Sequence, residues 1–258
     1  MASPSLLTEI RGGTGLITLN RPDILNAWDR PMRDGIVAIL KEFDANAKLG
    51  AIVMTGTGER AFSAGQDLAE AHDFDEDRAE EWIREFETYY DVVRSLSKPF
   101  VMALNGLAAG SAFQVALLAD IRVAHPEVRM GQPEINSGIA SITGPWIMRE
   151  HLGLSRTVEL ALTGRLMDAQ ECYRLGLVHH IVPRGQVLEK SLAIAAELSA
   201  KAPLAMRLNK AWLREMTEAG FRASIDAAIR AHRRSYGSGE PARKIDEFFA
   251  KRSNDPAH

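Results

Sequence analysis

Two loops of this sequence have residue types that could hold a carbonyl oxygen. Residues 61–68 read Ala-Phe-Ser-Ala-Gly-Gln-Asp-Leu after a predicted strand, so their small side chains could leave backbone amides facing a ligand. Residues 105–114 follow a second predicted strand and open a helix, where free amides attract an anion or a developing oxyanion. Two such loops could together donate to one carbonyl oxygen. Taken singly, each is also explained by an ordinary turn or by close packing of a helix on a strand.

The third segment supplies a titratable group. Residues 131–135 read Gly-Gln-Pro-Glu-Ile, which places Glu134 just after a proline and beside apolar residues. Partial burial would raise the pKa of this carboxyl and suit it to general acid or base chemistry near neutral pH. A glutamate after a proline is also a common helix-start residue, so the segment alone does not decide between these interpretations.

Other reactive side chains do not form a recognisable centre. His179 and His180 precede an apolar strand without a carboxylate at ligand spacing, so we interpret them as surface or partner contacts and expect no metal site. Cys172 is the one cysteine, which excludes an intrachain disulfide and a cysteine-based zinc or iron–sulfur site. Ser63 and Ser111 lack the Gly-x-Ser-x-Gly context of a nucleophilic serine. The glycine loops also lack the Gly-x-Gly-x-x-Gly spacing of a dinucleotide site.

The elements around these segments alternate between strand and helix. A helix with its first position near Pro31 can be capped by Asp29, and its apolar residues recur at spacings of three and four. The alternation favours an α/β core with crossover connections. The predicted strands cover residues 16–19, 52–55, 100–104, 121–124 and 128–130, and the further helices of this part cover residues 77–96 and 110–118.

After Gly144 the pattern becomes almost entirely helical. Ile181 and Val182 form the main strand signal there. A helical tail that cannot close around its own core often packs on a neighbour, so we expect an oligomer, with a self-contained lid as the alternative. The predicted helices cover residues 155–162, 168–175, 186–200, 203–216 and 220–234.

The composition places the chain among ordinary globular proteins. With 31 basic and 34 acidic residues and no block of like charge, it shows neither a nucleic-acid footprint nor a polybasic membrane patch. No run of about 18 apolar residues occurs, and the first residues lack a basic start followed by an apolar stretch. We therefore expect a cytoplasmic protein that binds neither nucleic acid nor a membrane.

Taken together and in order, the segments resemble the crotonase superfamily, which includes enoyl-CoA hydratases and enoyl-CoA isomerases. The resemblance covers nearly the whole chain, and it depends on the ordered set because no single piece is specific. The set comprises Leu-Asn-Arg-Pro-Asp at residues 19–23 with Asn26 and Ala27, residues 61–68, Lys98-Pro99, Asn105-Gly106, Ala119-Asp120, residues 131–134, residues 162–164, and residues 169–178.

The resemblance implies an α/β fold, a crotonase-like spiral of β-β-α units with a C-terminal helical trimerisation region. Residues 1–200 would form the spiral core with the active site. Residues 201–258 would form the helical region that packs on the core and on a neighbouring subunit, giving a homotrimer or a hexamer made of two trimers. No permanently bound cofactor is implied, and coenzyme A would enter as part of an acyl-CoA thioester substrate.

The resemblance also assigns roles to individual positions. The backbone amides of Gln66 and Ser111 would form the oxyanion hole, and stabilisation of a thioester enolate there would amount to roughly several kcal/mol. Phe248 and Lys251 match a segment that contacts the nucleotide from a neighbouring subunit. The coenzyme A contacts implied within the first loops are Leu25 near the nucleotide, and Ala64, Asp67 and Leu68 along the CoA chain.

The chain departs from the family's hydratases at one catalytic position. These have two glutamates, whereas this chain has Gln114 and Glu134. An amide cannot exchange a proton near neutral pH, so a single base remains, which suffices to move a double bond from Δ3 to Δ2. The next turn also differs, since Ile142 and Trp146 replace a wetter glycine-rich run, and the Pro145-Trp146 pair is similar to a turn of some isomerases.

These departures rank double-bond isomerisation slightly ahead of hydration of a 2-enoyl-CoA, with Gln114 holding a water or a polar group of the substrate. Thioester hydrolysis, decarboxylation and C–C cleavage use the same oxyanion hole in relatives. A non-catalytic acyl-CoA-binding scaffold is the alternative from another class. The segment from residue 72 to residue 90 could wall the acyl pocket, although an amphipathic helix packed on the core explains the same pattern. Its candidate wall residues are His72, Phe74, Trp82, Phe86 and Tyr89.

Overall fold

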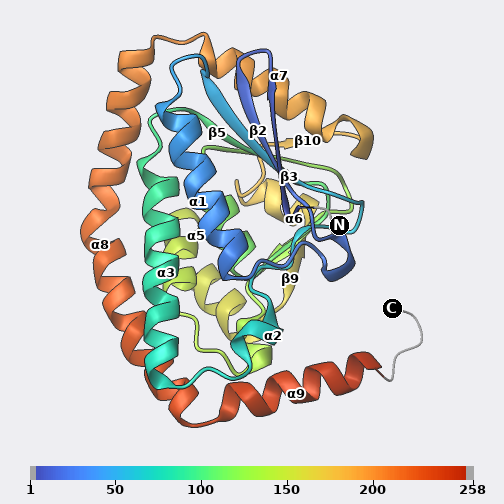
Figure 1. The fold of residues 1–258 in the computed structure, drawn as a ribbon, viewed down its shortest axis with the longest axis vertical. Helices are drawn as coiled ribbons and strands as arrows, with labels where there is room; N and C mark the ends of the chain where they lie inside the picture. The colour runs from blue at the N-terminus through green and yellow to red at the C-terminus, as the bar shows by residue number, and fades with distance from the viewer. Residues whose placement is uncertain (1–3, 254–258) are drawn as a thin grey trace.

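The computed structural model describes residues 4–253, with side chains up to residue 250. Two sheets form its centre, and helices surround them (Figure 1). The larger sheet has the order β1-β2-β3-β5-β7-β10, and all of its neighbouring strands are parallel except β1 and β2. Its strands are β1 (Leu6–Arg11), β2 (Thr14–Leu19), β3 (Ala51–Gly56), β5 (Phe100–Ala103), β7 (Ile121–Ala124) and β10 (His180–Ile181).

The smaller sheet supports the two loops. Its order is β4-β6-β8-β9, with β8 and β9 antiparallel. Three successive units, which begin at β3, β5 and β7, each add one strand to the larger sheet, one to the smaller sheet, and then a helical segment. This is the expected spiral of β-β-α units, although β1 and β2 both join the larger sheet. The strands of the smaller sheet are β4 (Ala61–Ser63), β6 (Leu107–Ala109), β8 (Arg129–Gly131) and β9 (Leu166–Asp168).

The helices cover both faces of the larger sheet. α7 packs on one face against alternate strand residues such as Val53 and Val101, while Ile52 and Met54 face the main core on the other side. The α-helices are α1 (Arg30–Ala45), α2 (Leu68–Ala71), α3 (Glu76–Ser95), α4 (Ser111–Leu118), α5 (Thr143–Thr163), α6 (Ala169–Arg174), α7 (Val187–Ser199), α8 (Pro203–Gly237) and α9 (Glu240–Ser253). The short 3-10 helices are η1 (Pro22–Ile24), η2 (Glu134–Ser137) and η3 (Arg184–Gln186).

Local signals predicted several helix starts correctly. Asp29 caps α1, since its Oδ1 accepts a hydrogen bond of 3.0 Å from the amide of Met32. The helix expected from residue 110 is α4. Glu134 does begin a helix, the 3-10 helix η2, and it also lies at the cavity described below.

Two predictions for the helical part were wrong. The break expected between residues 216 and 220 is absent, because α8 continues through Gly220, where an added Cβ would lie 2.6 Å from Trp146 Nε1. The glycine therefore serves the close approach of α5 to α8 and does not end the helix. Strand β9 was missed, since it is short and only its central residue, Met167, is buried.

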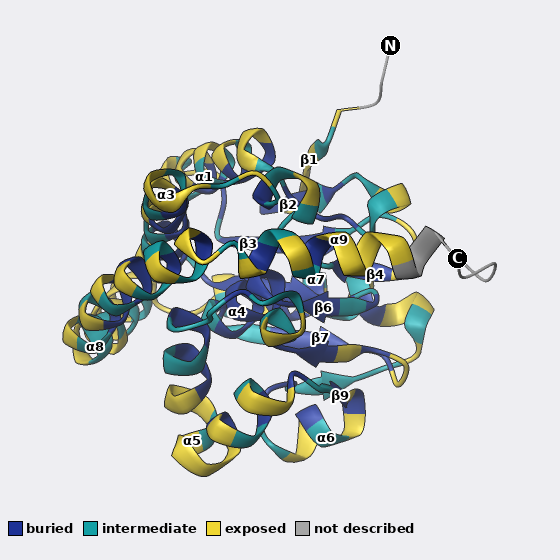
Figure 2. Ribbon diagram, turned by 90° about the horizontal axis from the view of Figure 1, so that it is seen from below, coloured by how far each residue is buried: buried dark blue, intermediate teal, exposed yellow. Residues whose placement is uncertain are grey.

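The C-terminal helices lie at the outside of the molecule. α8 runs along one edge beside α3, and α9 crosses in front of the sheets (Figure 1, Figure 2). The expected boundary near residue 200 falls between α7 and α8, and the division into two domains stays a prediction. Within residues 4–253, no helix has the length and apolar character needed to cross a membrane.

Candidate active site

A cavity of about 700 Å³ brings the predicted segments together. Its walls come from both glycine-containing loops, α3, η2 with the following turn, α8 and α9. The predicted site residues that line it are Leu25, Ala64, Gln66, Asp67, Leu68, Ser111, Gln114, Glu134 and Phe248.

The first loop turns sharply at Gly65. Its φ is +86°, and a Cβ there would lie 2.6 Å from the carbonyl oxygen of Ala109, so only glycine fits without a shift. The loop is fixed by backbone bonds to the segment before α1, with the amide of Ala64 donating to Leu25 O at 2.9 Å and that of Trp28 donating to Gly65 O at 2.9 Å. These bonds leave the amide of Gln66 without an acceptor among the described residues.

The second loop places the start of α4 beside the first. The Cβ position built on Gly65 lies 3.0 Å from the amide nitrogen of Ser111, so the two turns touch. The indole of Trp28 donates to Ser111 Oγ at 3.0 Å and holds this residue in place. Like Gln66, Ser111 has an amide that makes no hydrogen bond within the described chain, as expected at the first turn of a helix. Two free amides thus border one cavity.

Glu134 lies at the same turn. A Cβ on Gly110 would be 3.2 Å from its Oε1, and its Oε2 is buried without a partner among the described residues. Burial raises the pKa of Glu134 to about 7, which outweighs the opposing effect of hydrogen bonds to the carboxylate. Asp67, the other carboxylate lining the cavity, is already engaged with Arg21 at 3.2 Å and with the start of α2. Of the two carboxylates that line the cavity, Glu134 is therefore the one with an oxygen that has no partner among the described residues.

Gln114 links Glu134 to α3. Its Nε2 donates to Glu134 Oε1 at 3.1 Å, and its Oε1 accepts from the hydroxyl of Tyr90 at 2.5 Å. Because a phenol donates to the amide oxygen here, the amide nitrogen must face the carboxylate. Gln114 thus orients Glu134, and Oε2 is left as the free oxygen of that carboxylate.

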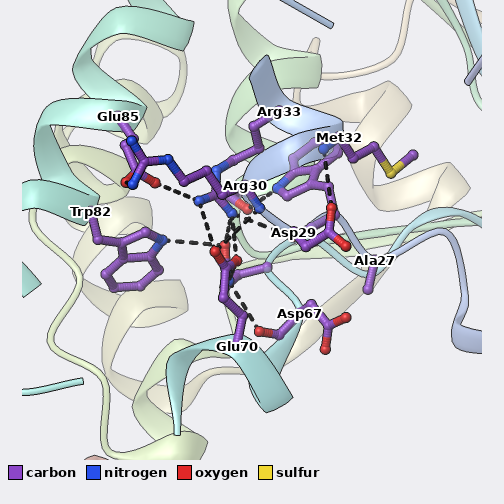
Figure 3. Close-up of polar contacts among 12 residues, drawn as sticks. Ala27, Asp29, Arg30, Met32, Arg33, Asp67, Glu70, Trp82 and Glu85 are labelled. Carbon is purple, nitrogen blue, oxygen red and sulfur yellow. Dashed lines mark hydrogen bonds and ion pairs between the residues drawn. The ribbon is translucent and has the colours of Figure 1, made fainter. Parts of the chain in front are cut away.

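The side chain of Gln66 fixes the first loop to α1 and α3. Figure 3 shows the surrounding Arg33, Glu70 and Trp82. Its Oε1 accepts from Arg33 Nη1 at 2.6 Å and from Trp82 Nε1 at 3.2 Å, while its Nε2 donates to Glu70 at 2.7 Å. Arg33 is 2% exposed and also pairs with Glu70 and Glu85, at 3.0 and 2.6 Å. Burial acts to raise the pKa of Glu70, but hydrogen bonds from Arg33 and Gln66 hold it below its ordinary value. These contacts therefore hold in place the loop that contains the backbone amide of Gln66.

Only some of the residues expected to wall an acyl pocket line the cavity. Trp82 and Phe86 line the cavity, and so does Ile142 from the turn after η2. Trp146 points elsewhere and packs on Phe221, with ring centroids 5.8 Å apart. The remaining candidates on α3 and before it, His72, Phe74 and Tyr89, do not line the cavity.

Helix α9 closes over the cavity of its own chain. Ser235 Oγ, near the end of α8, donates to Gly138 O at 3.1 Å and so directs the chain back toward η2. As a result Phe248 lines the cavity of its own chain, whereas a contact made from a neighbouring subunit was expected. Lys251 lies on the last turns of α9, and its side chain is outside the part that the structure describes.

Tyr90 and Arg33 hold the site together although neither was among the predicted site residues. Arg33 could have been suspected, since it follows Met32 on the edge of the apolar face of α1 and yet is charged. Tyr90 carries no such signal, because an aromatic residue on an amphipathic helix is usually a packing residue. Within residues 4–253, no group of three or more His, Cys, Asp or Glu side chains is placed to hold a metal ion.

Comparison with known proteins agrees with this arrangement. Residues 9–255 match the model of the enoyl-CoA hydratase/isomerase family. A protein of Rhizobium meliloti called "Probable enoyl-CoA hydratase" is 33% identical over the whole of both chains. A short-chain-enoyl-CoA hydratase of Clostridium acetobutylicum is 27% identical, covering 90% of this chain and 88% of its own.

Solved structures extend the likeness to the fold. The crystal structure of an enoyl-CoA hydratase/isomerase from Mycobacterium paratuberculosis superimposes with a TM-score of 0.87 at 27% identity, covering 94% of this chain and 98% of that one. With the family match over nearly all residues, the chain belongs to the enoyl-CoA hydratase/isomerase family of the crotonase superfamily and is an enzyme of that family.

Proposed function

We propose that this enzyme acts on an acyl-CoA thioester and moves a double bond from the Δ3 to the Δ2 position. The observation that carries the proposal is the chain of hydrogen bonds from Tyr90 through Gln114 to Glu134. It leaves one carboxylate with a free oxygen beside two unpartnered amides. A second group able to deliver or take a proton is not supplied by Gln114, since an amide does not titrate near neutral pH.

The reaction needs one base and one oxyanion site. Glu134 Oε2 takes the proton from the α-carbon of the 3-enoyl thioester, and the electrons of that C–H bond pass into the carbonyl to give a dienolate. The amides of Gln66 and Ser111 donate to the enolate oxygen and stabilise the charge that develops there. Glu134 then returns the proton to the γ-carbon, which restores the thioester and leaves the double bond at Δ2.

The position of the coenzyme A portion follows the same geometry. Leu25, Ala64, Asp67 and Leu68 lie on the first loop side of the cavity, and Phe248 covers it from α9. We assign these residues to contacts with the CoA chain and nucleotide. The acyl chain would extend toward the apolar wall of α3 and α8. Coenzyme A enters as part of the substrate. A cytoplasmic location of the protein stays a prediction.

Hydration of a 2-enoyl-CoA is the second candidate, favoured by the names of the curated relatives. In that reaction Glu134 would both activate the water and deliver the α-proton. Gln114 could contribute only the second proton of its Nε2, because its oxygen is held by Tyr90. The amide of Gln114, at the position where the second glutamate of hydratases is expected, is the reason that we place isomerisation first.

The assay that separates the two reactions uses purified protein with 3-enoyl-CoA and 2-enoyl-CoA thioesters, followed by absorbance and by product mass. We expect conversion of the 3-enoyl thioester without a mass change. Glu134→Gln should lower this rate by about 10²–10⁴-fold while CoA thioester binding persists. Glu189→Gln, at an exposed position on α7, is the matched control and should leave the rate unchanged.

A third variant sharpens the comparison. Gln114→Glu supplies the second glutamate, so it should add hydration of the 2-enoyl thioester to a protein that otherwise isomerises. Gain of one water by the unaltered protein would instead establish hydration and contradict our ranking. Binding of the thioesters without any reaction, equal in the unaltered protein and Glu134→Gln, would favour the acyl-CoA-binding scaffold.

Self-association is the remaining part of the proposal. The first half of α8 exposes Leu204, Leu208, Trp212 and Met216, each 59–63% exposed and spaced four residues apart. Such a contiguous apolar stripe on a surface helix is typical of a protein–protein contact. We assign it to a contact between copies of this chain, in a homotrimer or a hexamer.

A further inference from the structure

A histidine on α8 interrupts the apolar wall of the cavity. His232 lines the cavity, is 5% exposed, and packs edge-on against Trp82 with ring centroids 5.5 Å apart. Ile225, two turns earlier on α8, and Phe86 on α3 line the same cavity. Neither catalysis by Glu134 nor the CoA contacts use His232.

The hydrogen bonding of His232 fixes its tautomer. Nδ1 lies 2.8 Å from the carbonyl oxygen of Ala228, which can only accept, so the proton is on Nδ1. Burial lowers the pKa of His232 to about 4, so the ring is neutral at physiological pH. Nε2 is therefore a bare acceptor, and it has no hydrogen-bond partner among residues 4–253.

Among the described residues, no donor makes a hydrogen bond to this nitrogen, and the buried hydroxyl of Tyr236, one turn later on α8, does not reach it. The indole N–H of Trp82, the nearest polar group of the adjoining ring, is already bonded to Gln66 Oε1 at 3.2 Å. A water held there would meet mainly apolar surface, whereas an ordered buried water ordinarily has two to four polar partners. A donor attached to the substrate itself satisfies the acceptor without that requirement.

We infer that His232 is a specificity residue that accepts a hydrogen bond from a hydroxyl group on the acyl chain, so that the preferred substrates are hydroxylated acyl-CoA thioesters. The inference rests on the proposed function, since it takes this cavity as the acyl site. An unsubstituted chain would leave a buried acceptor unpaired, and the site would discriminate against it. The hydroxyl lies on the part of the chain beyond the reacting carbons, where α3 and α8 form the wall.

The test measures binding and turnover separately. Matched pairs of 3-enoyl-CoA thioesters, of short and medium chain length and with or without a terminal hydroxyl, are titrated by calorimetry into the Glu134→Gln protein. The same pairs are then compared as substrates of the unaltered protein. At one chain length, we expect the hydroxylated member of the pair to bind roughly tenfold more tightly than the unsubstituted member. Its kcat/KM should be higher by the same factor.

His232→Phe should abolish this preference while the unsubstituted thioester binds as well or better, because the aromatic shape is kept and the acceptor is lost. His232→Asn keeps a side-chain acceptor, so it should retain part of the preference for the hydroxylated thioester. This second variant also keeps the test valid if His232→Phe fails to fold. Ile225→Val on the same wall is the control: it changes apolar contacts for both members of a pair, so their ratio should stay the same.

The outcomes distinguish this inference from the function on which it rests. Turnover of both members at equal rates, with His232→Phe leaving their ratio unchanged, would overturn the hydroxyl preference alone. Failure of every thioester to bind would overturn the acyl-CoA function together with the inference.

Discussion

At the scale of single residues, Glu134, the proposed base, has a cost in stability. Burial raises its pKa to about 7 in the folded chain, whereas the ordinary pKa of a glutamate is 4.5. The folded state thus holds more protons than the unfolded state between these values, so stability falls as pH rises through this window and the penalty is complete above about pH 7. When ionised, the proposed base is therefore a buried charge without a full partner.

We expect Glu134→Gln to stabilise the protein at pH 8 by up to about 3 kcal/mol and to have little effect near pH 4.5. The glutamine cannot ionise, so it removes the penalty that the carboxylate carries, and its oxygen can still accept from Gln114. Urea unfolding at fixed protein concentration at the two pH values measures the difference. Glu189→Gln should not increase the free energy of unfolding. An equal effect of Glu134→Gln at both pH values would show that burial of the ionised carboxylate does not destabilise the protein.

At the scale of elements, the first loop depends on α1 and α3 as much as on its own turn. Arg33 from α1 reaches Gln66, Glu70 and Glu85, and its guanidinium also lies over the ring of Phe86, 5.0 Å from the centroid. Removal of the cation would leave Glu70 with one ion pair among the described residues, to Arg78 at 3.8 Å. Glu85 would keep its pairs with Arg78 at 2.8 Å and Arg30 at 3.3 Å, so the loss falls mainly on Glu70 and on the loop it holds. Breaking such a pair from one side is far more damaging than losing an exposed ion pair.

Arg33→Met should therefore lower the free energy of unfolding by about 3–5 kcal/mol and reduce kcat more than it changes KM, because the loop amide would no longer be held at one position. Arg33→Lys should recover part of the stability but little of kcat, since one ammonium cannot reach all three acceptors. Arg84→Met removes an exposed pair with Glu87 on α3 and should cost less than about 1 kcal/mol. Similar small losses for both arginines would show that the network does not position the loop.

The same elements show how far the sequence could predict this structure. Asp29 and the spacing of apolar residues predict α1 because a cap and a helical face are local signals. Gly220 misled the prediction, because its low helix propensity of about 1 kcal/mol is outweighed by the packing of Trp146 against α8.

The candidate site, too, could be predicted only in part from the sequence. The two loops and Glu134 could be found from residue types and from the ordered resemblance. The bonds of Tyr90 to Gln114 and of Arg33 to Gln66 join residues 24 and 33 positions apart, and nothing local in the sequence signals either pair. Contacts of this kind depend on how helices pack, which a pattern read along the chain does not contain.

At the scale of the whole molecule, the exposed apolar residues of α8 and α5 do not line the cavity that contains Glu134. α8 follows one edge of the fold (Figure 1), and the apolar stripe of its first half faces outward there. α5 adds Leu154, Val158 and Leu162, which are 66%, 46% and 68% exposed. Because the lining of the cavity is complete without these residues, loss of assembly should not by itself remove the base or the loop amides.

Trp212→Glu should convert the assembly to single chains, because a buried charge without a partner in the core of an interface opposes association. Light scattering during gel filtration gives the mass, and circular dichroism should show an unchanged helix content. Ala193→Glu puts the same charge on an exposed alanine of α7, outside the stripe, and should leave the mass at three or six times that of the chain. A protein that already has the mass of one chain before substitution would contradict the assignment of the stripe to self-association, and the folded single chain should then still bind acyl-CoA through its own α9.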